Sequence, residues 1–436
     1  MSSDVAHRSL VDRLRRSNPL PEGTFSVGVG LVANGIGAYA FTVLAARGLG
    51  DEAFSPLAVL WAAVFLAAPG FFLPLEQEVS RTVAARKARG EGASAVVRQA
   101  AIIGAGLLVV VVAATLVALP LVYDLFFDEQ VLLLVGFLLA LAGYCGAHLV
   151  RGVLAGEGRF DGYAAYFAAE GAMRVVVGVA FLVVGVTTAG PYGLTVGIVP
   201  FVAIAVALSR QRQMMTPGPP ARTGEITASL GALLTGSLLT ALLLNAGPLA
   251  VEILATPDET AEAGRFLAGL LIARVPLFLF QAVQASLLPK LALLASGHRW
   301  NEFRSALRKL LVAVSGLGAV ATLTAWSIGP QVVRITFGES FALGHRDLAL
   351  LALFSAVFMV GVTLGQTLIA LSSPAHMALG WGAGVLAFAV VTALGDDLYL
   401  RVELGLIAGT ATVVAVLGTA VAVRLRELPV TSITDA

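Results

Sequence analysis

The stretch QAAIIGAGLLVVVVAATLVALPLV, residues 99–122, decides the fold because its 24 residues include no charged side chain. A helix of about 20 apolar residues crosses the hydrocarbon core of a bilayer, whereas a barrel strand needs only about 9 to 11. Backbone groups in lipid must be paired within the segment, and an isolated run of this length achieves that as an α-helix. The stretch therefore predicts a membrane-spanning helix.

The rest of the chain repeats this pattern. Of its 436 residues, 58% are hydrophobic and 13% are charged, and the mean hydropathy of +0.89 is far above that of a soluble domain. We expect an all-α, polytopic membrane protein with about twelve spanning helices. The apolar segments cover residues 23–46, 53–75, 99–122, 130–150, 163–186, 190–209, 226–254, 264–289, 308–330, 347–371, 375–395 and 402–423.

Basic residues set the predicted orientation. Of the 28 Lys and Arg residues, 21 lie on the side of the N-terminus, 5 on the other side and 2 within spans. Cytoplasmic loops carry the excess of Lys and Arg, so we expect both termini in the cytoplasm and the chain in the cell membrane. Residues 1–22 carry four arginines and no short apolar region with a cleavage site, which indicates a retained first helix.

Two long basic loops, 81–98 and 290–309, follow the second and the eighth segments, about 200 residues apart. This spacing predicts two six-helix lobes of equal orientation, with a substrate site between them near the middle of the membrane. Pro217, Gly218, Pro219 and Pro220 mark a linker. The predicted parts are a tail (1–22), an N-lobe (23–210), a linker (211–225), a C-lobe (226–424) and a tail (425–436).

The sequence lacks the motifs of several classes of protein, such as ATPases with a Walker site and metalloproteins. There is no Gly-Lys dipeptide and so no Walker phosphate loop, the five histidines have no metal-ligand spacing, and Cys145 is the single cysteine. The net charge of +1 does not favour nucleic acid as a partner. We expect no catalytic residue, no cofactor, no metal site and no ATPase site. The glycine run from Gly28 to Gly37 lies in an apolar span and predicts helix packing.

Two arginines lie inside spans, where a charge costs about 2.5 to 3.5 kcal/mol and usually faces a wet cavity or a partner. Arg274 lies near mid-depth of its segment and forms a polar stripe with Gln281 and Gln284. It is a cavity candidate, and a salt bridge to another helix is the alternative. Arg174 follows Glu170 by four residues, which allows either a local ion pair or a substrate or ion site.

Other polar residues are weaker candidates for the cavity. Asn34 and Asn245 occupy comparable places in the two halves, and hydrogen bonding between helices is their alternative role. Arg47 lies at the outer end of the first span. It is interpreted either as a gate or substrate contact or as a side chain that extends its charge to the membrane surface. Glu76 and Glu78, just after Pro74 at the cytoplasmic end of the second span, are interpreted as a solvated helix end, with a proton site as the alternative.

Four segments carry a resemblance to a known family. They are AFTVLAARGLGDEAFSPLAVLW (40–61), RGVLAGEGRFDGYAAYFAAEGAMRVVVG (151–178), QASLLPKLALLASGHRWNEFRSALRKL (284–310) and ITFGESFALGHRDLALLALFSAVFM (335–359). Together they resemble the multidrug/oligosaccharidyl-lipid/polysaccharide (MOP) exporter superfamily, in particular its lipid-linked oligosaccharide flippase branch. The resemblance implies a two-lobed, MATE-like fold.

The same resemblance implies a flippase that turns a lipid-linked oligosaccharide or a polysaccharide precursor, such as one for lipopolysaccharide, across the membrane by alternating access. Its partners would be that glycolipid, membrane lipids and glycan assembly enzymes. An ion-coupled drug exporter of the same superfamily is the alternative, although it would need a carboxylate-rich site, and Glu170 is the one mid-span carboxylate that we identify. A membrane-embedded glycosyl or acyl transferase is a third possibility, which lacks a sizeable outer loop and a plausible base.

Overall fold

The computed structural model describes residues 24–211, 216–221, 227–256, 259, 261–277, 280, 291, 294, 299–371 and 373–427. Every regular element in these ranges is a helix. The elements are α2 (Thr24–Ala88), α3 (Ser94–Val117), α4 (Leu119–Phe127), α5 (Val131–Gly156), α6 (Phe160–Val184), α7 (Ala189–Ser209), α8 (Thr227–Leu254), α9 (Glu262–Ala273), α11 (Trp300–Thr336), the 3₁₀ turn η1 (Glu339–Phe341), α12 (His345–Ala370), α13 (Pro374–Leu394) and α14 (Leu398–Glu427).

Ten helices in the described ranges are long and apolar enough to cross a membrane. The first of them, α2, covers two of the predicted spans. The two parts are separated by a kink at Gly50, whose φ of 78° is a conformation that glycine adopts without strain. The eighth predicted span, 264–289, coincides at its start with α9, and residues 278, 279 and 281–289 of that span lie outside the described residues. The prediction of an all-α, polytopic membrane protein is confirmed.

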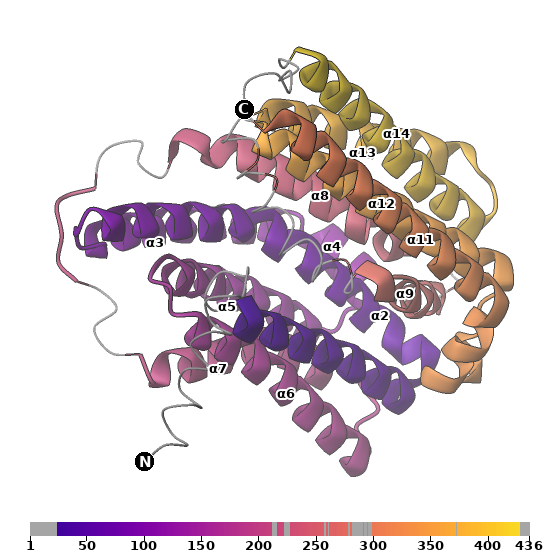
Figure 1. Ribbon diagram of the computed structural model, residues 1–436. Helices are drawn as coiled ribbons and strands as arrows, with labels where there is room; N and C mark the ends of the chain where they lie inside the picture. The colour runs from indigo at the N-terminus through magenta and orange to yellow at the C-terminus, as the bar shows by residue number, and fades with distance from the viewer. Residues whose placement is uncertain are drawn as a thin grey trace, which may run out of the picture.

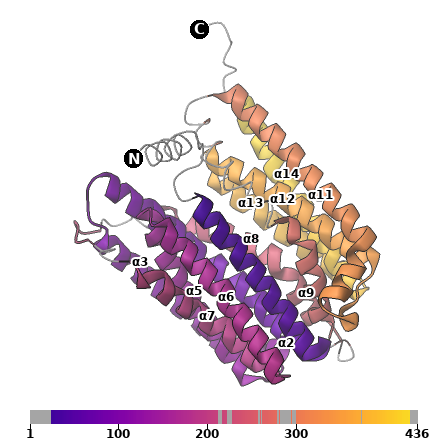
Figure 2. The same ribbon diagram turned by 60° about the horizontal axis from the view of Figure 1, so that its bottom comes forward.

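The helices form two groups, which Figure 1 and Figure 2 show as indigo to magenta and as orange to yellow. Helices α5, α6 and α7 pack with α2, while α11, α12, α13 and α14 pack among themselves. The groups meet where α2 packs on α8 and α9. The exact lobe boundaries stay a prediction, because residues 212–215 and 222–225 of the expected linker lie outside the described part.

Close backbone contact joins α2 to α6. A Cβ atom added to Gly37 would lie 2.5 Å from Cα of Gly171, and one added to Gly30 would lie 2.8 Å from the carbonyl oxygen of Ala164. Small residues allow helices in lipid to approach in this way. Gly30 and Gly37 of the glycine run therefore serve helix packing, whereas Gly28 has nothing within 4 Å of an added Cβ.

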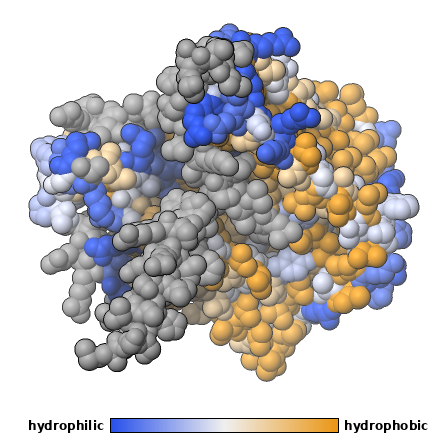
Figure 3. Space-filling model, viewed as in Figure 1, coloured by the Kyte–Doolittle hydropathy of each residue, from blue (hydrophilic) through white to orange (hydrophobic). Residues whose placement is uncertain are grey.

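The outer surface is apolar where lipid would cover it. Val117, Val183 and Leu394 are more than three-quarters exposed, and α11 presents Val312, Leu323 and Trp326 outward. Figure 3 shows hydrophobic residues over much of the face formed by the C-terminal helices, with hydrophilic residues gathered toward the edges. An exposed apolar surface of this extent fits a bilayer as solvent.

Candidate functional site

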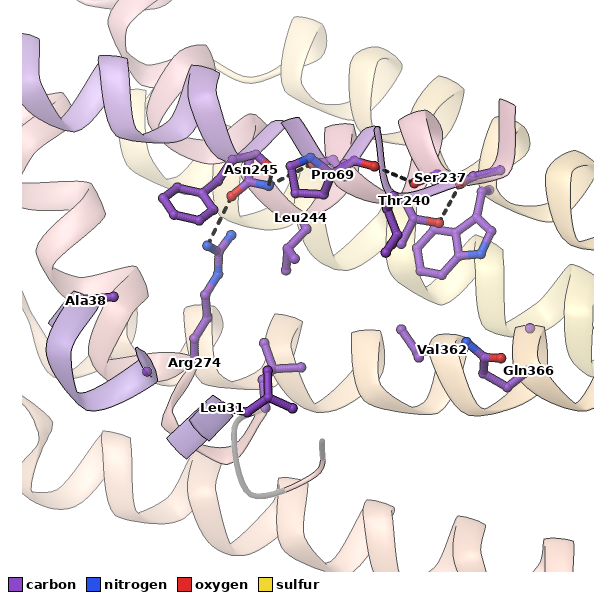
Figure 4. A pocket seen from close by; sticks show the side chains of 18 of the residues that line it. Leu31, Ala38, Pro69, Ser237, Thr240, Leu244, Asn245, Arg274, Val362 and Gln366 are labelled. Atoms are coloured by element: carbon purple, nitrogen blue, oxygen red, sulfur yellow. Dashed lines mark hydrogen bonds between the residues drawn. The ribbon is translucent and has the colours of Figure 1, made fainter. Parts of the chain in front are cut away.

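A cavity of about 540 Å³ lies between the two groups of helices. Its walls come from α2, α6, α8, α12 and α13, together with the end of α9 (Figure 4). Most of the lining is apolar, including Trp61, Phe65, Leu244 and Trp381. This volume and this composition are typical of a site for a small molecule or for the head of a larger one.

The charge of the cavity is positive. Arg174 and Arg274 line it, and none of the described lining residues is a carboxylate. The polar remainder consists of amide and hydroxyl side chains, among them Asn34, Asn245 and Gln366. In a largely apolar space such charges act strongly, because little water screens them.

Arg274 follows α9 directly, and its backbone N–H donates to the carbonyl of Leu270 at 3.0 Å. Its Nη1 donates to Oδ1 of Asn245 over a long 3.4 Å, while its buried Nε and Nη2 have no hydrogen-bond partner among the residues that the structure describes. Asn245 is itself fixed, because its Nδ2 donates to the carbonyls of Phe65 and Ala241, each at 3.0 Å. Figure 4 shows the guanidinium reaching toward this amide. Arg274 therefore presents unpaired donors in an apolar cavity.

Arg174 has the opposite environment. Its Nη2 donates to Oε1 of Glu170 at 2.7 Å and to the hydroxyl of Tyr144 at 2.5 Å, and that hydroxyl donates to Glu170 at 2.7 Å. The guanidinium also lies 5.4 Å from the ring centre of Trp61. The ion pair that the spacing of four residues allows is thus present in the structure. Since Glu170 neutralises Arg174, this arginine offers less to a substrate than Arg274 does.

Of the remaining predicted site residues, one lines the cavity, one does not, and two lie outside the described residues. Asn34 lines the cavity and lies 3.5 Å from Nη1 of Arg174. Gln281 and Gln284, the polar stripe expected beside Arg274, lie outside the described residues. Arg47 does not line the cavity; it donates instead to the backbone carbonyls of Thr336, at 2.6 Å, and Ile335. It thus forms a contact between α2 and α11, and its role as a gate stays a prediction.

One end of the space between the groups is closed by direct contacts. Near the bend of α2, Asp51 pairs with Arg265 at 2.6 Å, and the ring of Phe54 packs edge-on against Phe341 at 5.5 Å. The cavity reaches toward the opposite end, where Gln77 and Met377 line it. On the predicted orientation, the closed end is the outer one.

Two of the buried charged groups whose burial the sequence did not show are glutamates. Glu76, interpreted as a solvated helix end, is only 7% exposed; it accepts hydrogen bonds from Arg151 at 2.6 Å and from Tyr163 at 2.8 Å, and contacts His148. The expectation was wrong because these partners lie on other helices. Likewise, Glu170 is not the only carboxylate deep in the bundle, since Glu403 of α14 is fully buried.

Comparisons with known proteins agree with this architecture. No family model matches the chain. It is 29% identical over 405 residues to an uncharacterized protein of Mycobacterium tuberculosis, covering 90% of this chain and 88% of the relative. A second uncharacterized protein of that organism is 28% identical over 388 residues, covering 87% and 86%.

Solved structures share the fold. An inward-facing multidrug resistance MATE family transporter of the MOP superfamily superposes with a TM-score of 0.71 at 17% identity, covering 92% of this chain and 96% of its own. The outward-facing conformation of such a transporter gives 0.65 at 16% identity, covering 94% and 98%. A MOP superfamily transporter from Pyrococcus furiosus, whose binding pocket is described as having reverse polarity, gives 0.63 at 16%, covering 95% and 98%. The chain has the fold of MATE transporters of the MOP superfamily.

Proposed function

We propose that this protein is a transporter that moves an anionic, lipid-linked oligosaccharide or a related glycolipid across the cytoplasmic membrane by alternating access. The observation that carries the proposal is Arg274, whose Nε and Nη2 lack partners in a mostly apolar cavity. A guanidinium always keeps its charge and pairs phosphate oxygens in a bidentate way. In a lipid-linked phosphate, the phosphate would pair with Arg274 and the lipid would contact the apolar lining of the cavity.

Alternating access is supported by the contrast between the two ends. Contacts such as Asp51 with Arg265 close one end, and the cavity extends toward the other. The fold is shared with transporters captured both inward-facing and outward-facing. A protein that exposes one central site to each side in turn needs this kind of arrangement.

A drug exporter is the second candidate, since two of the structural neighbours are multidrug resistance transporters. A cationic drug would need a carboxylate in the cavity, and the charge that the described lining presents without a counter-ion is that of Arg274, since Arg174 is paired with Glu170. The polarity of the cavity therefore favours the anionic glycolipid. An anionic drug would satisfy Arg274 equally, so the test must compare substrates.

The test uses purified protein in liposomes and a fluorescent polyprenyl-diphosphate oligosaccharide, with a neutral glycolipid and a cationic dye as comparisons. Losing charge-assisted hydrogen bonds worth about 1.5 to 3 kcal/mol should slow transport of the diphosphate about 10- to 100-fold in Arg274→Ala. Arg274→Lys should recover part of the rate, because the charge returns without the planar fork.

The matched control is Arg426→Ala, which removes an exposed arginine at the end of α14. It should transport at the wild-type rate. Wild-type transport of the diphosphate by folded Arg274→Ala would remove the proposed site. Transport of the cationic dye but not of the diphosphate by the wild type would identify the drug exporter instead.

A further inference from the structure

A carboxylate without any partner lies inside the C-terminal group of helices. Glu403, in the second turn of α14, is 0% exposed, and within the described part of the chain neither of its carboxylate oxygens has a hydrogen-bond partner. Its neighbours in the chain, Val402 and Leu406, are equally buried. An isolated ionised carboxylate in such surroundings would cost several kcal/mol.

Two other buried glutamates show what a satisfied carboxylate looks like in this protein. Glu76 pairs with Arg151 at 2.6 Å, and Glu170 pairs with Arg174 at 2.7 Å. Both receive a tyrosine hydroxyl as well, from Tyr163 and Tyr144 respectively, each at 2.8 Å or less. Among the described residues Glu403 forms neither an ion pair nor a hydrogen bond, so its burial needs a different explanation.

The charges around Glu403 are predominantly negative. Asp347 and Arg346 of α12 and Asp397 just before α14 act on it electrostatically. Arg346 is already engaged, at 2.8 Å from Asp347 and 3.9 Å from Asp397. An ionised Glu403 would make three carboxylates around one guanidinium, without a hydrogen bond of its own.

The helices packed against α14 do not change this balance. Their other charged or titratable side chains in the described residues are His345 on α12, Glu252 on α8, His376 on α13 and Glu262 with Arg265 near the start of α9. None of them forms a hydrogen bond to Glu403, and Arg265 is paired with Glu262 and Asp51.

We propose that Glu403 is a proton-binding site whose occupancy changes during the transport cycle. A carboxylate oxygen takes up a proton from water to give the neutral acid, which suits the buried position, and returns it to water when the surroundings open. The described residues contain no group of three His, Cys, Asp or Glu side chains that could hold a metal ion, and a proton needs no further ligand. The part of this proposal that concerns coupling rests on the proposed transport function.

A chain of side-chain contacts connects the neighbourhood of Glu403 to the closed end of the molecule. Tyr399 lies one turn before it on the same helix face, and the Tyr399 hydroxyl donates to the carboxylate of Glu262. Glu262 in turn pairs with Arg265, which binds Asp51 of α2. Opening that end would disturb this chain of contacts and expose the neighbourhood of Glu403 to water.

The first test reads the proton directly and does not require transport. Dicyclohexylcarbodiimide is an apolar reagent that reacts with protonated carboxyl groups, and peptide mass spectrometry locates the adduct. We expect Glu403 to be labelled in purified protein and to lose the label at alkaline pH. Glu170 and Glu76 should stay unlabelled, because each is held as a carboxylate by an arginine.

Two variants provide the controls. Glu403→Gln should remove the label and keep the wild-type melting temperature, because glutamine resembles the neutral acid. Glu170→Gln should keep the label at Glu403. An unlabelled Glu403 in folded wild-type protein would overturn the proposal, and so would protection of Glu403 by sodium ions at constant pH, which would identify a sodium site.

The second test concerns coupling. In liposomes with an imposed proton gradient, Glu403→Gln should lose the acceleration that the gradient gives the wild type, yet bind the diphosphate substrate as tightly. A Glu403→Gln protein with an unchanged response to the gradient would overturn the coupling role. Failure of the proposed substrate class would show separately, as unchanged transport in Arg274→Ala, and would leave the labelling result standing.

Discussion

The guanidinium of Arg265 lies 2.6 Å from the carboxylate of Asp51, one residue beyond the bend of α2 at Gly50. Arg265 is also held by Glu262 of its own helix at 2.7 Å. The pair thus joins α9 to the first group of helices where the space between the groups is closed. Both partners are partly exposed, so each such contact contributes only about 0.2 to 1 kcal/mol.

Asp51→Asn should therefore favour opening of this end modestly. A loss of about 0.2 to 1 kcal/mol raises the open population by roughly 1.4- to 5-fold. The reporter is a single cysteine at Ser55, which is buried and accepts a hydrogen bond from the backbone N–H of Gly264 at 3.2 Å. After replacement of Cys145, labelling of this cysteine by a water-soluble maleimide should accelerate by that factor in Asp51→Asn.

The control is Glu302→Gln, which breaks an exposed ion pair with Arg299 within the start of α11. It should leave the labelling rate at position 55 unchanged. Equal rates in Asp51→Asn and its parent would show that the ion pair does not contribute to closure.

The ion pair inside the first group leads to a larger effect. Arg174 is fully buried and Glu170 is 2% exposed, so Glu170→Gln leaves an uncompensated charge in the bundle. Removing one partner of a buried pair costs about 3 to 5 kcal/mol. We expect a lower melting temperature in detergent and a lower protein level.

Removing both charges should restore much of that stability, so the double variant Glu170→Gln with Arg174→Gln is the informative comparison. A Glu170→Gln protein with wild-type stability and no transport would contradict the structural interpretation. It would make Glu170 part of the transport machinery.

The difference between Glu170 and Glu403 shows what sequence reasoning can recover. Glu170 and Arg174 are four residues apart on one helix, so their pairing follows from helix geometry alone. The partners of Glu76 lie 72 to 87 residues away on other helices, and only the packed bundle brings them together. Glu403 lies at the start of the predicted span 402–423, close to Asp396, Asp397 and Arg401, and hydropathy alone does not show that its side chain is buried between helices.

The helices themselves were predictable because lipid leaves the backbone few options. Uninterrupted apolar length defined them, and the two spans predicted on either side of Gly50 correspond to the two parts of α2, which the non-helical backbone of Gly50 separates. Asn245 and Arg274 were both candidates for the cavity, and their contact depends on how α8 and α9 pack. The hydropathy of the sequence does not show which side chains of two helices come into contact.

The predicted orientation can be tested with single cysteines in intact cells lacking Cys145. Ser305 of α11 is exposed among basic residues, and Glu339 of η1 is 84% exposed in its side chain at the other end of the molecule. The charge distribution predicts that a cysteine at position 339 reacts with a membrane-impermeant maleimide and that one at position 305 does not. The reverse pattern would invert the topology, and with it the assignment of the closed end as the outer one.

The last prediction compares a glycine-to-alanine substitution at a packed position with the same substitution at an exposed position. The first changes helix packing, and the second changes only the helix propensity. In Gly37→Ala the new Cβ would lie 2.5 Å from Cα of Gly171, and backbone atoms cannot rotate away. Separating α2 from α6 should cost about 1 to 3 kcal/mol. Gly106 of α3 is exposed and has nothing within 4 Å of an added Cβ, so Gly106→Ala should stabilise the protein by up to about 1 kcal/mol.

Melting temperatures in detergent should therefore move in opposite directions for these two variants. Gly37 and Gly171 each lie three residues from a cavity residue, Asn34 and Arg174, so Gly37→Ala should also weaken substrate binding while Gly106→Ala leaves it unchanged. If Gly37→Ala melted at or above the wild-type temperature, α2 and α6 would not be in backbone contact, and the wall of the cavity that Arg174 forms would need a different arrangement.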